Sequence, residues 1–336
     1  MNPRYRRLLI PGLLIALLVI VVIGSLARKA DAAAARTEVV STLSDGRINE
    51  SSGLVVSLDH EDRAYTINDS GNASDVYAIR VSTGETLGTT TVGADFVDAE
   101  ALSIDGDGTL WVADTGDNMA ERTDAALYSL PETVDGTATA AAERYPITYP
   151  GGSIDVEALV VNPRTGEKFL ISKGLFGGTV FSLPDPLVPD EPNEAVAMAG
   201  EIPGLVTDAA FTPDGRFVVA RDYSEAYVLD PVTWEIVSST ELPSVDQGET
   251  LAMEPSGRSY LVGSEGTDSP LIRVPFTAPV GESDAPEDPA PTRGAPSAAA
   301  TSAPADGNGF AGATWFWAVV VVALLAAISG AATRKR

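Results

Sequence analysis

The stretch Asp98-Ala-Glu-Ala-Leu102 decides the fold, because variants of it recur along the chain. In each copy a polar turn, usually with a carboxylate, leads into a short apolar strand. Further copies read DVEAL at 155–159, VTDAA at 206–210 and QGETL at 247–251, while ESSGL at 50–54 has serine in the acidic position. The aligned positions are 48, 57, 51 and 41 residues apart. Such intervals are typical of four-stranded propeller blades with variable loops.

Each copy is followed by two further strand signals. A turn such as Asp107-Gly108 precedes a second apolar strand, and glycine supplies the positive φ that tight hairpin turns require. A third strand recurs at 76–81, 126–130, 179–183, 226–229 and 271–274. The sequence therefore predicts an all-β fold, a β-propeller of about five four-stranded blades, with a six-bladed ring as the alternative. A β-sandwich fits less well, because it would not explain the fixed frame.

The two ends of the repeat predict how the ring closes. The last copy ends at Phe276, before a fourth strand can form. Ahead of the first copy, Thr37 to Leu43 is a segment rich in residues that favour β-strands. If this segment supplies the outer strand of the last blade, no exposed sheet edge remains to invite aggregation. We therefore expect the propeller to span residues 36–276.

Both termini are too apolar to belong to a soluble core. Arginines at 4, 6 and 7 precede an apolar run from Leu8 to Ala27, and small residues follow. Basic, apolar, small is the order of a secretory signal, but about 20 apolar residues can also span a bilayer. Residues 1–35 are therefore expected to be a signal peptide or an uncleaved signal anchor.

A second apolar run, at 311–332, has Trp315 and Trp317 at one edge and a basic tail at the other. This pattern predicts a transmembrane helix within residues 311–336 whose tail is cytoplasmic. Residues 277–310 are acidic and rich in Pro, Ala and Ser, which predicts a disordered stalk. The propeller is therefore expected on the extracytoplasmic side of the cell membrane.

Composition excludes several classes of function. The chain has no cysteine and a single histidine, His60, in a polar turn, so thiolate zinc sites, cysteine nucleophiles and multi-histidine metal sites cannot form. All 47 acidic residues lie between Asp31 and Asp306, while 8 of the 22 basic residues are terminal. The region between the termini is therefore strongly acidic, and it repels nucleic acid. Carboxylates, hydroxyls or a hard cation must supply any chemistry.

The sequence resembles a group of exported bacterial propellers. Ile67-Asn-Asp-Ser-Gly71, the motif at 98–102 and the stretch LWVADTGDN at 110–118 look like the SdiA-regulated and esterase-like, phytase-related propeller families. This resemblance covers roughly residues 48–275 and is carried mainly by the first two blades. It implies a propeller with calcium sites and, in the phytase branch, phosphomonoester hydrolysis. The basic residues that would hold a phosphate are scarce, since Arg122, Lys173, Arg221 and Arg258 are the only candidates near the motifs.

Equivalent acidic residues are expected to meet at one end of the ring. In a propeller the first strand of every blade lines the channel, so the residues that begin these strands converge. Like charges at close range cannot all ionise without a counter-ion, and Ca²⁺ prefers six to eight oxygen ligands. The predicted metal ligands are Glu100, Glu157, Asp208 and Glu249, with the oxygen-rich turns adding Asp69, Asp114, Asp117 and Asn118. Alternatively, these acids are structural acceptors of backbone N–H groups.

Two functions remain open on the sequence alone. The first is a membrane-anchored binding or scaffold module that is not an enzyme, whose partner is an unidentified extracellular ligand or protein. The second is a calcium-dependent hydrolase of the phosphoesterase or esterase type that uses the channel carboxylates.

Overall fold

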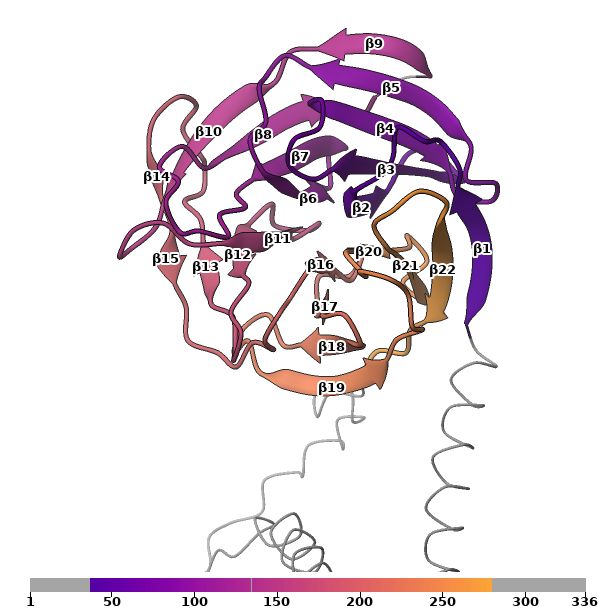
Figure 1. Cartoon of the computed structure of the whole chain (residues 1–336). Helices are drawn as coiled ribbons and strands as arrows, with labels where there is room; N and C mark the ends of the chain where they lie inside the picture. Colours follow the sequence, from indigo (N-terminus) through magenta and orange to yellow (C-terminus); the bar gives the residue numbers. More distant parts are fainter. Residues whose placement is uncertain (1–36, 134, 280–336) are drawn as a thin grey trace, which may run out of the picture. The chain divides into compact units, whose positions relative to one another are not determined.

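The computed structural model describes residues 37–133 and 135–279, so the expected terminal segments and nearly all of the stalk lie outside the described residues. No helix in the described part of the chain has the length and apolar character needed to cross a bilayer. The described residues form 22 strands in five sheets, arranged radially around one axis (Figure 1). The five-bladed propeller is confirmed, and the six-bladed alternative is excluded within these residues.

Each blade contains four antiparallel strands that follow one another from the axis outward. The first blade contains β2 (Ser51–Val56), β3 (Arg63–Asn68), β4 (Asp75–Arg80) and β5 (Thr86–Val92). The second contains β6 (Ala99–Ile104), β7 (Thr109–Asp114), β8 (Ala126–Pro131) and β10 (Glu143–Thr148). The third contains β11 (Val156–Val161), β12 (Lys168–Ser172), β13 (Val180–Ser182) and β15 (Val196–Ala197).

The fourth and fifth blades complete the ring. The fourth contains β16 (Asp208–Phe211), β17 (Val218–Arg221), β18 (Glu225–Leu229) and β19 (Ile236–Glu241). The fifth contains β20 (Thr250–Met253), β21 (Ser259–Gly263), β22 (Ser269–Pro275) and β1 (Glu38–Leu43). The sequence motif thus marks the inner strand of every blade, as expected.

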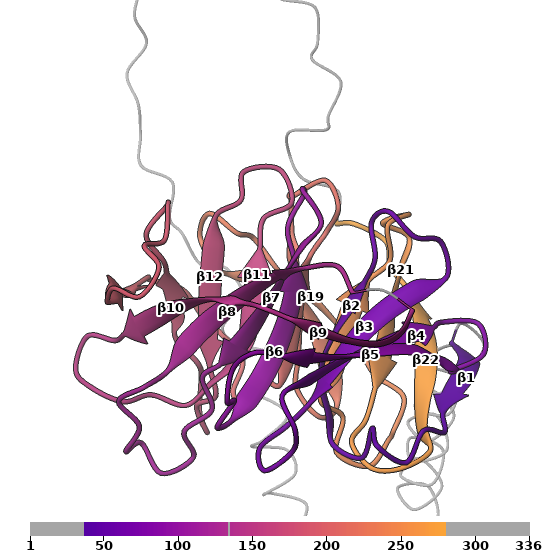
Figure 2. The ribbon, with the colours of Figure 1, turned by 90° about the horizontal axis from the view of Figure 1, so that it is seen from above.

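Two short strands that the repeated sequence motif does not predict each add a fifth strand to the outer edge of the first two blades. β9 (Gly136–Ala140) pairs in parallel with β5, and β14 (Asn193–Glu194) pairs in parallel with β10. Figures 1 and 2 show β9 lying along the outside of β5. β9 belongs to the connection between β8 and β10, and β14 to the connection between β13 and β15. Each of these two connections therefore pairs with the outer strand of the preceding blade, which removes an unpaired backbone edge.

The expected closure of the ring is confirmed. β1 pairs antiparallel with β22, in a register that places Glu38 opposite Arg273 and Leu43 opposite Ser269. The N-terminal strand therefore supplies the outer edge of the last blade. Leu43 is 1% exposed and packs against residues of the first and fifth blades, including Leu54 and Leu261.

Apolar clusters between neighbouring blades hold the ring together, and hydrogen bonds near the axis supplement them. The Ser52 hydroxyl donates to the Glu100 carbonyl at 2.7 Å, and the Thr207 hydroxyl donates to the Gly248 carbonyl at 2.9 Å. Gly53 has a φ of +69°, and a Cβ there would lie 2.5 Å from the Leu102 nitrogen. Only glycine therefore allows the first two inner strands to approach this closely.

The closure predicts unequal effects of two substitutions within β1. Leu43→Ala should lower the free energy of unfolding by about 2–5 kcal/mol, because it leaves a cavity between the first and last blades. Val39→Ala in the same strand is the matched control and should change it by less than about 0.5 kcal/mol, since Val39 is 64% exposed. Urea unfolding measures both values. Equal losses would show that β1 does not close the ring.

Candidate metal centre at the acidic mouth of the channel

The inner strands all begin at one end of the channel, which we call the acidic mouth. Glu100 and Glu157 lie at the start of β6 and β11, and Glu249 directly precedes β20. Their exposed fractions are 5%, 2% and 5%. Three buried carboxyl groups therefore occupy equivalent positions in three blades, as the sequence predicted.

Local backbone irregularities set the direction of two of these side chains. The register between the first and second strands shifts between Ala99 and Ala101, and again between Val156 and Ala158. Glu100 and Glu157 thus lie at β-bulges. A bulge adds a residue to one strand and redirects its side chain, which is why bulges often border functional sites.

A second set of equivalent positions lies beside the first. In four blades a residue one or two positions beyond the second strand donates its backbone N–H to a carbonyl at the start of the repeated motif. The accepting residue lies two positions before Ser52, Glu100, Glu157 or Glu249. These bonds are Asp69 to Glu50 at 2.9 Å, Gly116 to Asp98 at 3.0 Å, Lys173 to Asp155 at 3.0 Å and Glu265 to Gln247 at 2.9 Å. The same backbone geometry therefore brings an acid, a glycine, a lysine and another acid to the mouth.

Three carboxylates from the first two blades come together there. Asp69, Asp98 and Glu100 each have a carboxylate oxygen within 4.8 Å of the others. Gly116 makes this possible, because a Cβ at that position would lie 2.4 Å from Glu100 Oε1 and 2.6 Å from an Asp98 carboxylate oxygen. Asp69 and Glu100 were predicted as ligands, whereas Asp98 was not, although its place two residues before Glu100 was a usable signal.

The electrostatics of this group favour a bound cation. Burial, followed by the charges of Glu157, Asp69 and Asp98, raises the pKa of Glu100 to about 10. Burial and the Asp69 carboxylate raise the pKa of Asp98 to about 6. Since the ionised forms repel one another in a poorly solvated mouth, a hard cation would relieve the conflict. The all-oxygen donor set fits Ca²⁺ better than a soft metal.

A lysine compensates the next carboxylate around the ring. Lys173 Nζ lies 2.9 Å from Glu157 Oε1 and 5.9 Å from the centre of the Tyr223 ring. Burial raises the pKa of Glu157 to about 8, although Lys173 opposes the shift. Burial also raises the pKa of Glu249, although the charge of Lys173 and a hydrogen bond with Tyr223 oppose this shift. Within the described residues, the acidic mouth thus has one side, at Asp69, Asp98 and Glu100, that contains no ion pair, and another side, at Glu157 and Glu249, that contains Lys173.

Asp208 holds the fourth motif position but uses its oxygens differently. It is fully buried, and its carboxylate accepts the backbone N–H of Ala209 at 2.8 Å and that of Leu251 at 2.6 Å. It is not among the three carboxylates that approach one another. Asp208 therefore matches the structural alternative, joining the fourth blade to the fifth.

The acidic residues of the oxygen-rich turn after β7 are not among the three carboxylates that approach one another. Asp114 accepts the backbone N–H of Asp98 at 2.8 Å and pairs with Arg122 at 2.9 Å. Asp117 accepts the backbone N–H groups of Glu121 and Arg122, both at 2.8 Å, and Asn118 is exposed. Asp114 and Asp117 therefore shape the loop, and Asp114 helps to position Asp98.

Of the four basic residues near the motifs, only Lys173 pairs with a carboxylate of the acidic mouth, that of Glu157. Arg122 is engaged by Asp114 and Asp124. Arg221 is fully buried and donates to the carbonyls of Thr250 and Gly263 at 3.0 and 3.1 Å. Arg258 lies in the turn between β20 and β21, at the opposite end of the inner strand.

Comparison with known proteins shows likeness of fold only. No family model and no curated protein matches the chain. Similar solved structures include a candidate gluconolactonase (14% identity, TM-score 0.42, covering 67% of this chain and 74% of that chain) and the glutaminyl cyclase of Myxococcus xanthus (13%, 0.48, 72% and 97%). A luciferin-regenerating enzyme is also similar (10%, 0.41, 67% and 78%). These values are too low to indicate a shared activity.

The raised pKa values predict how the stability of the metal-free protein depends on pH. The pKa of Glu100 is higher in the folded protein than in the unfolded chain, so the folded state holds the proton more tightly. The contribution of Glu100 to folding stability is therefore most favourable below its unfolded pKa of 4.5. Stability should therefore fall as pH rises from about 5 toward 9. Glu100→Gln should remove much of this fall and stabilise the protein at pH 8 by on the order of 2 kcal/mol.

Melting temperatures measured in EDTA from pH 5 to 9 test this dependence. Glu241→Gln, which changes an exposed carboxyl on β19, is the matched control and should leave the pH dependence unchanged. A Glu100→Gln profile that parallels the unsubstituted protein would contradict the assigned burial cost.

Proposed function

We propose that this chain is a membrane-anchored, extracytoplasmic binding module whose acidic mouth holds a divalent cation, Ca²⁺. The observation that carries the proposal is the approach of Asp69, Asp98 and Glu100 within 4.8 Å, with no lysine or arginine of the described residues forming an ion pair with any of them. Bound there, the cation would supply positive charge that both neutralises these carboxylates and attracts an oxygen of a ligand.

The surroundings of the mouth favour a ligand with polar and apolar parts. Lys173 offers a second positive charge beside the three carboxylates. Leu175 and Phe176, in the loop that follows Lys173, are 67% and 98% exposed. Leu205 in the neighbouring loop is 36% exposed, and its backbone N–H donates to the Gly174 carbonyl at 2.9 Å. Exposed apolar groups gathered beside a polar pocket are typical of binding surfaces.

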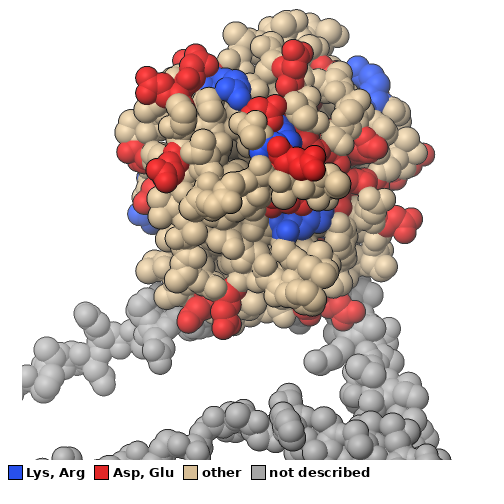
Figure 3. Space-filling model, turned by 60° about the vertical axis from the view of Figure 1, so that its left-hand side comes forward, with Lys and Arg blue, Asp and Glu red and all other residues tan. Residues whose placement is uncertain are grey.

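The charge of the propeller agrees with an extracellular role without nucleic acid. The whole sequence has a net charge of −25, and Figure 3 shows acidic side chains spread over the visible face with fewer basic ones between them. Such a surface is soluble and repels polyanions. Anchoring by residues 1–35 and 311–336 is part of this proposal, since both segments lie outside the described residues.

Calcium should stabilise the folded protein. A cation that binds only the folded state adds about 2.7 kcal/mol at a hundredfold excess over Kd, which raises the melting temperature by several degrees. Asp69→Asn combined with Asp98→Asn should abolish this response. Asp246→Asn, an exposed acid in the loop before β20, is the matched control and should retain it. Equal melting temperatures in calcium and EDTA for the unsubstituted protein would refute the metal centre.

A calcium-dependent hydrolase is the second candidate, and the Glu157–Lys173 pair favours it. Glu157 lies beside the three carboxylates, and a pKa near 8 suits a general base at slightly alkaline pH. The resemblance to esterase-like, phytase-related propellers points the same way. The scarcity of available basic groups disfavours a highly charged phosphate substrate. Among the described residues near the motifs, Lys173 is already paired with Glu157, and Arg122 with Asp114 and Asp124.

Hydrolysis of nitrophenyl acetate and nitrophenyl phosphate by the calcium-loaded full chain separates the two candidates. An enzyme should show a rate that increases as pH rises through about 8, because the base must lose its proton, and Glu157→Gln should reduce the rate at least 100-fold. Glu241→Gln should not change it. Absence of turnover with both esters, together with a normal calcium response, would favour the binding module.

A further inference from the structure

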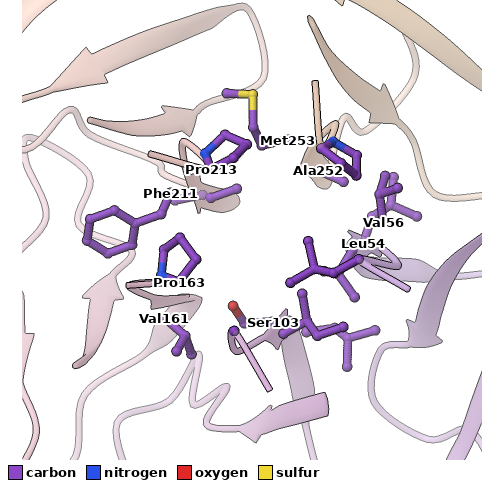
Figure 4. A pocket seen from close by; sticks show the side chains of 17 residues that line it. Leu54, Val56, Ser103, Val161, Pro163, Phe211, Pro213, Ala252 and Met253 are labelled. Carbon is purple, nitrogen blue, oxygen red and sulfur yellow. The ribbon is translucent and has the colours of Figure 1, made fainter. Parts of the chain in front are cut away.

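The channel has a second mouth with opposite chemistry, which we call the apolar mouth. It lies where the inner strands end and encloses a cavity of about 260 Å³. None of its lining residues is charged, and Ser103 is the polar side chain among them. Figure 4 shows side chains from all five blades around this cavity, including Leu54, Val56, Val161, Phe211, Ala252 and Met253. The acidic and apolar mouths therefore suit different ligands.

Both ends of the described chain leave the propeller on the side of the apolar mouth. β20 and β22 both flank β21 in antiparallel fashion, so β22, like the inner strand, ends on that side. β1 runs opposite to β22, and so it begins there, with Glu38 opposite Arg273. The backbone N–H of Phe276 donates to the carbonyl of Arg258, in the turn that follows β20. Thr37 and Phe276 moreover line one cavity, which places the two ends close together.

A strongly apolar run lies further along the sequence beyond each of these two ends. The run from Leu8 to Ala27 is separated from Thr37 by nine residues, which span at most about 30 Å when fully extended. The run at 311–332 follows the stalk. If these runs insert in a bilayer, as the sequence predicts, the N-terminal one holds the apolar mouth near the lipid surface.

We propose that the apolar mouth takes the hydrocarbon chain of a zwitterionic membrane lipid. An uncharged cavity favours a saturated or unsaturated hydrocarbon over any polar ligand, because burying apolar surface is the available driving force. The five turns that surround this mouth contain eight acidic and three basic residues. This excess of negative charge disfavours anionic head groups. The inference rests on the proposed membrane anchoring but not on the metal centre.

Photolabelling of the full chain in phosphatidylcholine vesicles tests this inference. A trace of phosphatidylcholine with a diazirine in its acyl chain should label peptides that contain 54–58, 102–106, 211–213 or 252–255, in addition to the terminal runs. Ser103→Phe fills the cavity and should reduce mouth labelling at least fivefold without changing terminal labelling. Ser70→Phe, exposed beside the acidic mouth, is the matched control and should retain full labelling.

A second measurement does not depend on filling the cavity. Because the chain has no cysteine, a fluorophore can be attached at Ser256→Cys, next to Pro255 of the apolar mouth, or at Ser70→Cys. A quencher on the lipid chains should reduce fluorescence at position 256 and not at position 70. Vesicle flotation separates the failures: protein that does not float refutes the anchoring and the inference with it. Protein that floats, with no mouth labelling and no quenching at 256, refutes the lipid site alone.

Discussion

Pairing of β1 with β22 is the constraint on which the rest of this structure depends. Four of the five blades are built from consecutive segments, but the last has only three strands of its own. Supplying its outer strand from β1 removes an unpaired edge and places both ends of the described part of the chain on one blade. With the ring closed, each inner strand lies between two others, and both the channel and its mouths acquire a defined shape.

Closure also explains how residues far apart in sequence form one site. Asp69 belongs to the first blade and Glu249 to the last, yet both face the same mouth because every inner strand begins there. The recurring backbone hydrogen bond beyond the second strand places one further residue at the mouth in four of the five blades. The charge at that position differs between blades, because the residue is Asp69, Gly116, Lys173 or Glu265, whereas the backbone hydrogen bond is the same.

The two mouths illustrate how one strand can serve different purposes at its two ends. At the start of each inner strand, buried carboxyl groups carry a desolvation cost that a cation or a lysine can offset. At the other end, residues of the same strands and of the turns that follow them line an uncharged cavity. Asp208 directly precedes Ala209, which lines that cavity, and its carboxylate accepts the backbone N–H groups of Ala209 and Leu251. A binding role for either end is therefore compatible with the other.

The sequence alone indicated about five blades, the inner strands and the origin of the closing strand, because these depend on local periodicity, turn residues and a repeat interval. The structure decided between five blades and six. It also indicated that Glu100, Glu157 and Glu249 share one mouth, since equivalent repeat positions must converge around an axis. Only the tertiary structure decided which acids approach one another. The grouping of Asp69 with Asp98 depends on contact between blades and on the missing side chain of Gly116. The bonding of Asp208 to Leu251 likewise depends on how two blades pack, and no local pattern in either segment encodes that distance.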